Sequence, residues 1–308
     1  MWRCLARWLL LAAPATLAAQ SEGSVVAALP GSTRAAGLGG AGAAIVGDAG
    51  AIFANPAGLA TIRRFAIEGS YQRYLAGTGF SSAAVAARVG RLDLGVGALA
   101  LDYGREPEIV PDPATGGRRG TPTGRSFQSA EILAVSSVVY RYGLIAVGAS
   151  GKYVRQTIAD WSADAWAGDA GLAIALFDLM ALGVSVQNLG GDLGGGGARL
   201  PRRTRAGFTM NYVDPQGTFR LLTTLEGQWP AGRPAVLVVG LEGGLVAKGV
   251  GLVGRLGYVS RGGGVVNDAS PVTYGASVEL GRLHFDYAFQ GYDALGGGTH
   301  RVGLRWAP

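Results

Sequence analysis

Cysteine is almost absent from this sequence of 308 residues: the only one is Cys4. It lies in a segment built like a secretory signal peptide, in which basic Arg3 and Arg7 precede a short apolar run from Trp8 to Leu17 and small residues suited to cleavage. We therefore expect residues 1–19 to be removed. The mature chain then has no thiol, which excludes disulfides and thiolate metal sites and suits an oxidising compartment.

Charge and long apolar runs are also scarce. Charged residues make up 16% of the chain. No segment after residue 19 is an uninterrupted run of the ~18 apolar residues that a membrane-spanning helix needs. The best stretch, residues 165–186, is broken by Asp169 and Asp178. These absences exclude a helical membrane protein, while an apolar content of 48% excludes a disordered chain.

Histidine is scarce too. With two histidines in the chain, a histidine metal site has little to draw on, and we expect neither a metal nor a cofactor. The formal net charge of +6 raises the question of nucleic acid. Because the arginines are spread singly rather than clustered with aromatic residues, we expect no nucleic-acid partner.

What the sequence has in abundance is alternation of apolar and polar residues. In residues 204–212, Phe208 and Met210 fall on one face, while Arg205 and Thr209 fall on the other. Successive side chains of a strand point to opposite faces, so such segments are strands with one apolar and one polar side, and most are long enough to cross a bilayer when tilted. Fourteen segments show this pattern, at residues 64–74, 80–89, 91–103, 127–141, 144–156, 165–177, 179–188, 202–213, 218–229, 234–247, 250–260, 272–280, 283–291 and 299–307.

The connections between these segments are sorted by length. Every second one is a tight turn, such as Lys248-Gly249, whereas most of the others are longer, for example residues 104–126, 157–164 and 189–201. Short turns on one rim and long loops on the other, with an even number of strands, are typical of an outer-membrane barrel. In lipid a sheet must close on itself, because every backbone group has to be paired within the protein.

We therefore predict an all-β fold: a closed antiparallel transmembrane β-barrel of about fourteen strands over residues 63–308. Its expected location is the outer membrane of a Gram-negative-type bacterium, with both termini on the periplasmic, short-turn rim. Aromatic residues near the strand ends would form girdles at the membrane interfaces. The residues concerned are Tyr71, Tyr103, Tyr140, Tyr153, Tyr212, Trp229, Tyr258, Tyr292 and Trp306.

The stretch GLGGAGAAIVGDAGAIFANPAGLA, residues 37–60, contains the pattern Gly37-x-Gly39-x-x-Gly42 of dinucleotide-binding sites. Such a site needs a buried strand before the glycines, a helix after them and an acidic residue about 20 positions later. Residues 29–36 include a Pro-Gly pair and no strand pattern, and no acid falls between Gly50 and Glu68. The nucleotide interpretation is therefore rejected.

We expect residues 20–62 instead to form a small N-terminal hatch, a compact piece that starts on the periplasmic rim and folds into the barrel lumen as a plug. Residues 34–46 are suited to a short helix or an irregular coil whose glycines allow close packing. The run Asn55-Pro56-Ala57-Gly58 has turn chemistry, since proline fixes one backbone dihedral and glycine is free to take a positive one.

This stretch resembles the N-terminal signature of the FadL/OmpP1/TodX superfamily of outer-membrane barrels, and is most similar to its PorV/PorQ branch. The resemblance implies a fourteen-stranded barrel with a hatch that carries the Asn-Pro-Ala turn. It also implies either passage of hydrophobic molecules or service as a type IX secretion component. This chain is much shorter than the long-chain fatty-acid transporters, which favours the shorter branch. The residues that the resemblance places in the hatch and its gating are Gly37, Gly39, Gly40, Gly42, Asp48, Asn55, Pro56, Ala57 and Gly58.

The polar faces of the predicted strands carry charged residues that would line the lumen. Paired arginines and carboxylates would keep the lumen polar. The same arginines would also attract anions, because a guanidinium binds a carboxylate through two hydrogen bonds, and both interpretations stay open. The predicted lumen-lining residues are Arg203, Arg205, Arg220, Glu226, Arg255, Glu279, His284, Asp286, Arg301 and Arg305.

Three functions follow from these patterns. The first is passive binding or passage of hydrophobic molecules across the outer membrane, gated by the hatch, in a barrel surrounded by outer-membrane lipid. The second is an interaction protein of the secretion machinery, in which outer loops such as the proline-rich residues 104–126 hold a partner. The third is an outer-membrane lipid hydrolase, because His284 and Asp286 share a face beside Ser277. An inward histidine beside an aspartate is more often a satisfied pair, so we expect no enzyme.

Overall fold

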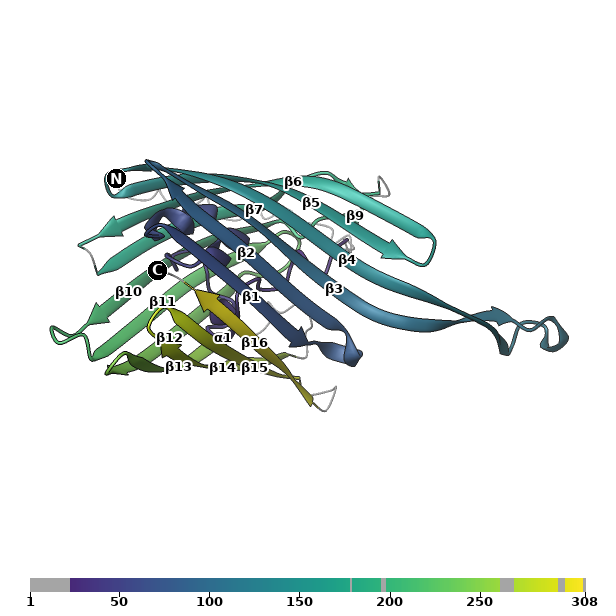
Figure 1. Ribbon diagram of the computed structural model, residues 1–308. Coiled ribbons are helices and arrows are strands. Elements are labelled where there is room, and N and C mark those ends of the chain that lie inside the picture. The colour runs from purple at the N-terminus through teal and green to yellow at the C-terminus, as the bar shows by residue number, and fades with distance from the viewer. Residues whose placement is uncertain (1–22, 178, 195–197, 261–268, 293–296, 307–308) are drawn as a thin grey trace, which may run out of the picture.

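The computed structural model describes residues 23–177, 179–194, 198–260, 269–292 and 297–306. The predicted signal peptide, residues 1–19, lies outside this part of the chain. Fourteen strands close into one antiparallel barrel, in which each strand pairs with its neighbours in the chain and β16 closes on β1 (Figure 1). The prediction of an all-β, closed antiparallel barrel of about fourteen strands is confirmed.

Two of the sixteen described strands, β8 (Asp192–Leu193) and β9 (Ala198–Arg199), form a separate small sheet in the connection between β7 and β10. The barrel strands are β1 (Phe65–Arg73), β2 (Gly79–Val89), β3 (Leu92–Pro111), β4 (Gly120–Tyr142), β5 (Ile145–Ile158), β6 (Trp161–Leu176), β7 (Met180–Gly190), β10 (Arg203–Val213), β11 (Phe219–Pro230), β12 (Val236–Ala247), β13 (Val250–Val259), β14 (Ala269–Leu280), β15 (Leu283–Tyr292) and β16 (Gly297–Trp306).

The barrel wall is apolar outside and largely polar inside. On β11, Leu225 and Trp229 are about half exposed, whereas Thr224, Glu226 and Gln228 on the other face are buried. The same alternation runs through β10, β15 and β16. A closed cylinder whose outer surface consists of exposed leucine, valine and aromatic side chains matches a hydrocarbon environment, because all backbone pairing is internal.

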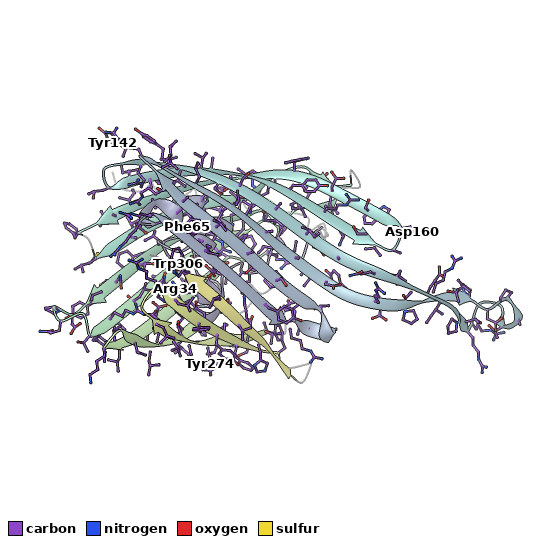
Figure 2. All side chains as sticks on the ribbon, in the orientation of Figure 1. Arg34, Phe65, Tyr142, Asp160, Tyr274 and Trp306 are labelled. Carbon is purple, nitrogen blue, oxygen red and sulfur yellow. The ribbon has the colours of Figure 1, made fainter. Side chains whose placement is uncertain are left out.

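The predicted aromatic girdles need one correction. Tyr103 and Tyr292 point into the barrel: the Tyr103 hydroxyl donates to the Glu131 carboxylate at 2.6 Å, and Tyr292 is 6% exposed. Tyr292 is the last residue of β15, and Tyr103 follows the last residue of β3 that pairs with β2. The other seven remain on the outer face; among them, Trp306 packs edge-on against Phe65 where β16 meets β1 (Figure 2).

The two rims differ, though less through loop length than predicted. Tyr142 marks a short turn on one rim and Asp160 lies at the opposite end of the barrel (Figure 2). The predicted loop at residues 157–164 is wrong: only Ala159 and Asp160 lie outside β5 and β6. Longer strands, rather than longer loops, carry the chain outward here.

The predicted loop at residues 104–126 is also largely strand. β3 leaves its pairing with β2 at Asp102, and β4 joins β5 at Ser129, so residues 103–111 and 120–128 pair only with each other and project far beyond the barrel (Figure 1). We call these residues the β3–β4 extension. Register shifts after Asp102 and Pro107 interrupt the alternation that a sequence pattern relies on. Prolines are tolerated because the outer edges of both strands are unpaired.

The first and last described residues of the chain lie toward opposite rims of the barrel. Ile67 of β1 pairs with Trp306 of β16, so the C-terminal strand ends on the short-turn rim. The first described residues lie toward the opposite end, where the backbone N–H of Gly23 donates to Arg199 at 2.8 Å. Residues 1–22 are outside the described part, so the prediction for the N-terminus stays a prediction.

The described helices are short and lie mostly before β1. They are α1 (Thr33–Gly37) and the 3₁₀ turns η1 (Ala49–Phe53), η2 (Pro56–Thr61), η3 (Leu75–Gly77) and η4 (Pro113–Thr115). Among the residues that the structure describes, no helix is long and apolar enough to cross a membrane.

The apolar exterior generates a first prediction. Leu225 faces outward at mid-strand on β11, between Phe208 and Val239. Leu225→Arg should destabilise the barrel by about 2–4 kcal/mol, because it places a charge in hydrocarbon near the bilayer centre. Reversible urea unfolding in lipid vesicles, followed by tryptophan fluorescence, measures the change. Leu225→Met is the control, and equal stability of the arginine variant would contradict a lipid-facing wall.

Candidate functional site: an ionic ring inside the barrel

Residues 23–62, here called the N-terminal segment, lie inside the barrel (Figure 1). Helix α1 contacts β13 to β16, and the turns η1 and η2 contact β1 to β7. The segment therefore touches the wall on both sides. The α1 helix covers only four residues, 34–37, of the predicted 34–46 helix or coil, because positive backbone dihedrals at Gly39 and Gly40 end it.

Three arginines and three carboxylates form a closed ring where the segment meets the wall. Arg34 binds both Asp48, at 2.7 Å, and Glu242, at 2.8 Å. Glu242 accepts from Arg255 at 2.6 Å, and Arg255 reaches Asp286 at 2.8 Å. Arg305 closes the ring by contacting Asp286 at 3.3 Å and Asp48. We call these six residues the ionic ring: Arg34 and Asp48 come from the segment, and the other four come from β12, β13, β15 and β16.

The six side chains of the ionic ring are largely buried, so their charges depend on one another rather than on water. Its most exposed member is Arg34, whose side chain is 13% exposed. An ion pair removed from water is held together only when its geometry is good and its remaining donors and acceptors are satisfied. Alternating charges around a closed ring meet that condition, because every carboxylate faces two guanidinium groups.

The charge of Asp48 is fixed by its neighbours. Burial opposes ionisation, but Arg305 and Arg34 together hold the pKa of Asp48 well below its ordinary value. A lowered pKa contributes stability that is present above the ordinary value of about 3.9 and lost only as the pH falls through the lower folded value. Burial likewise opposes the charge of Arg34, but Glu242 and Asp48 raise its pKa above the ordinary value.

The glycine pattern also binds a carboxylate, but one from the protein itself. The backbone N–H groups of Gly42 and Ala43 both donate to Glu226 of β11 at 2.7 Å. Glu226 is paired with Arg205, which also donates to the carbonyl of Gly40 at 2.9 Å. The backbone N–H groups that could bind a nucleotide phosphate thus bind the carboxylate of a barrel side chain instead.

Asn55 is the most thoroughly bonded residue of the predicted turn. Its side-chain oxygen accepts from the N–H of Ala57 at 3.0 Å and caps η2, while its amide donates to the carbonyls of Ala43 and Leu172. It is fully buried. Asn55 therefore joins two parts of the segment to β6, with Pro56 starting the 3₁₀ turn.

Two more barrel residues hold the start of the segment. Arg301 of β16 is 2% exposed and donates to the carbonyls of Pro30 and Gly31. Glu131 of β4 accepts from the Ser24 hydroxyl at 2.9 Å and the Val26 N–H at 3.1 Å.

One side of the interior is richer in charge and the other is richer in apolar residues, although Lys152 and Asp169 form a buried ion pair on the second side. All four barrel members of the ionic ring lie on β12 to β16. On β2 to β6 the inward residues are mainly apolar, and segment residues such as Val26, Ile52 and Leu59 pack against them. The apolar wall residues of this cluster are Phe80, Ala84, Ala86, Leu99, Leu101, Leu133, Val135, Val139, Ala146, Val154, Ala163, Ala165 and Ala173.

The structure places the predicted lumen residues on the inner face of β10 to β16. Arg205, Glu226, Arg255, Asp286, Arg301 and Arg305 meet the segment or the ionic ring, as described. Arg220 pairs with Glu279, which also faces His284 at 3.0 Å. Arg203 lies on the same face of β10 as Arg205.

Among the described residues, Ser277, His284 and Asp286 are not arranged as the hydrolase hypothesis requires. Ser277 is opposite Asp286 across β14 and β15, whereas His284 is opposite Glu279. The imidazole nitrogen Nδ1 of His284 faces Glu279 and Arg305, and no hydrogen bond joins it to Ser277 within the described chain. In the part of the chain that the structure describes, no group of three His, Cys, Asp or Glu side chains is arranged to hold a metal.

Sequence reasoning missed Arg34, Glu242 and Glu131. Glu242 stands in the glycine-rich run of β12, where its inward direction follows from the alternation and could have been recognised. Arg34 had no such signal, since its direction depends on how the segment enters the barrel.

The ionic ring generates a second prediction. Asp48→Asn leaves one positive charge in excess among buried groups, which should weaken the seating of the segment by about 3–5 kcal/mol. Hydrogen exchange of residues 30–50, read by mass spectrometry, should accelerate. The double variant Arg34→Gln/Asp48→Asn removes one charge of each sign and should accelerate it less. Exchange in Asp48→Asn no faster than in the unmodified protein would refute this account of the ring.

No protein-family model matches this sequence, and no curated protein matches it. Solved structures match its fold. The Pseudomonas putida toluene transporter TodX is 13% identical, with 92% of this chain and 98% of that chain covered and a TM-score of 0.58. The Ralstonia pickettii toluene transporter TbuX is 15% identical, covering 92% and 99%, with a TM-score of 0.57. A Pseudomonas aeruginosa FadL homologue is 11% identical, covering 90% and 98%, with a TM-score of 0.54.

At such identities the likeness concerns the fold, and it does not bear on the PorV/PorQ branch. This chain has the barrel fold of the FadL-like hydrophobic-compound channels.

Proposed function

We propose that the protein is a passive outer-membrane channel for apolar molecules, and that residues 20–62 act as a hatch that controls access through the barrel of residues 63–308. One observation carries the proposal: the N-terminal segment is held across the lumen by buried ion pairs on one side and apolar packing on the other. The fold shared with toluene transporters supports an apolar solute. No chemical step is required.

The divided interior favours an apolar rather than an anionic solute. In a lumen that conducted carboxylates, arginines would need to be available to them. Here Arg34, Arg205, Arg255 and Arg305 are each bound to a carboxylate of the protein. The inward face of β2 to β6 offers apolar side chains instead. We propose periplasmic placement of the short-turn rim, and with it of the C-terminus.

One feature favours a second candidate, an interaction protein of the secretion machinery with PorV/PorQ-like character. The β3–β4 extension exposes both faces, including Ile109 and Val110, and an isolated two-stranded hairpin is marginally stable alone. Gentle affinity purification from native membranes distinguishes the two. Co-purified secretion proteins, lost on shortening the extension, would favour the second candidate, and a lone barrel with bound lipid would favour the channel.

The channel proposal yields a third prediction. Asn55→Ala/Pro56→Ala removes the cap of η2 and three hydrogen bonds of Asn55, so the hatch should loosen while the barrel stays folded. Flux of a small aromatic hydrocarbon into liposomes containing the variant should rise several-fold. Asp112→Ala/Pro113→Ala, which removes the equivalent cap in the exposed turn η4, is the matched control. Unchanged flux in the hatch variant, with a folded barrel, would count against a gating hatch.

A further inference from the structure

Glycines on the inner wall mark where the N-terminal segment lies. At ten of them, on nine strands, a Cβ atom would come within 3.3 Å of a segment atom. A contact below 3.0 Å requires one of the two groups to shift, and a contact between 3.0 and 3.3 Å requires the neighbour to give by a few tenths of an ångström, so a side chain at these positions presses on the segment. The ten are Gly95, Gly97, Gly148, Gly171, Gly183, Gly207, Gly240, Gly257, Gly275 and Gly303.

Gly183 of β7 and Gly148 of β5 both face backbone atoms of the segment. At each, the three nearest atoms to a Cβ all belong to the segment. A Cβ on Gly183 would meet the carbonyl of Ala43 and lie 2.8 Å from the Cα of Ala44. A Cβ on Gly148 would lie 2.8 Å from the nitrogen of Ala57. Backbone atoms cannot rotate away as side-chain ends do, so the segment itself would have to move.

Most charged anchors that hold the segment also have partners within the barrel. Without the segment, Glu242, Arg255, Asp286 and Arg305 still form an alternating chain of ion pairs. Arg34 and Asp48 remain a pair on the segment.

The same holds outside the ring. Glu226 keeps Arg205, Glu131 keeps the Tyr103 hydroxyl, and Arg301 keeps Ser70 and Ser82. Glu68 is the exception, because the N–H of Gly50, at 3.0 Å, belongs to the segment. Removing one partner of a buried pair is strongly unfavourable, and this arrangement mostly avoids it.

We infer that the lumen-facing glycines are positioning residues that form a seat for the N-terminal segment, and that the segment can leave this seat without unfolding the barrel. The glycines set its register by steric exclusion. The ionic ring divides into two neutral parts, so its charges stay paired when the segment leaves. This inference rests on the proposed function, since it names the residues that would keep a hatch closed.

A disulfide measures the seat directly. A Cβ on Gly207 would lie 3.3 Å from the Cβ of Ala43, which is within a few tenths of an ångström of the roughly 3.5–4.5 Å found in disulfides. Ala43→Cys/Gly207→Cys, in a Cys4→Ser background that removes the only native cysteine, should therefore cross-link readily on mild oxidation of the folded protein in detergent. Adding Gly183→Ala should reduce the cross-linked fraction several-fold and raise the KCl conductance of the uncross-linked protein in planar bilayers. Gly148→Ala is the second variant.

Gly151→Ala is the matched control, because it lies on the same strand as Gly148 and its Cβ would meet nothing within 4 Å. A gel assay of heat modifiability confirms that each barrel is folded. If Gly183→Ala and Gly148→Ala cross-link and conduct like Gly151→Ala, the seat is refuted while the channel proposal stands. If cross-linking falls but conductance and aromatic-hydrocarbon flux do not change, the seat stands and the gating function fails.

Discussion

The pairing of buried charge governs the interior of this barrel. Most charged side chains on the inner face of β10 to β16 are buried, so each of these needs a partner within hydrogen-bonding distance. The ionic ring solves this by alternating three arginines with three carboxylates. Because Arg34 and Asp48 contribute one charge of each sign, the segment neither adds to nor removes from the net charge of the wall.

The charges, the apolar contacts and the wall glycines each fix a different aspect of how the segment lies in the barrel. A segment held only by apolar packing would have no fixed orientation in a cylinder with a smooth wall. Charges on one side fix its orientation, while Ile52 and Leu59 on the other side pack against apolar residues of the wall. The ion pairs therefore attach the segment to the wall, and the apolar contacts on the other side leave these ion pairs undisturbed. Glycines such as Gly183 leave room for the backbone of the segment and so fix its position sterically.

Much of the wall could be predicted from the sequence because a strand repeats every two residues. Phe208 and Arg205 reveal their faces without any knowledge of their neighbours, and fourteen such segments imply closure. The alternation no longer reveals the strands where the period is interrupted: register shifts after Asp102 and Pro107 conceal the β3–β4 extension, and Tyr103 points inward at its base. The ring could not be predicted, because Arg34 and Glu242 are 208 residues apart and their contact depends on how the segment is placed.

The glycine stretch illustrates how one local chemistry serves different ends. Exposed backbone N–H groups at glycines bind anions, whether the anion is a phosphate or a carboxylate. In a nucleotide site the anion arrives with the ligand; here Glu226 brings it from the wall, and Arg205 neutralises it. The pattern Gly37-x-Gly39-x-x-Gly42 therefore indicates backbone N–H groups that can bind an anion. Which anion they bind depends on the surrounding strands. In a closed barrel, the supplier is the inner wall.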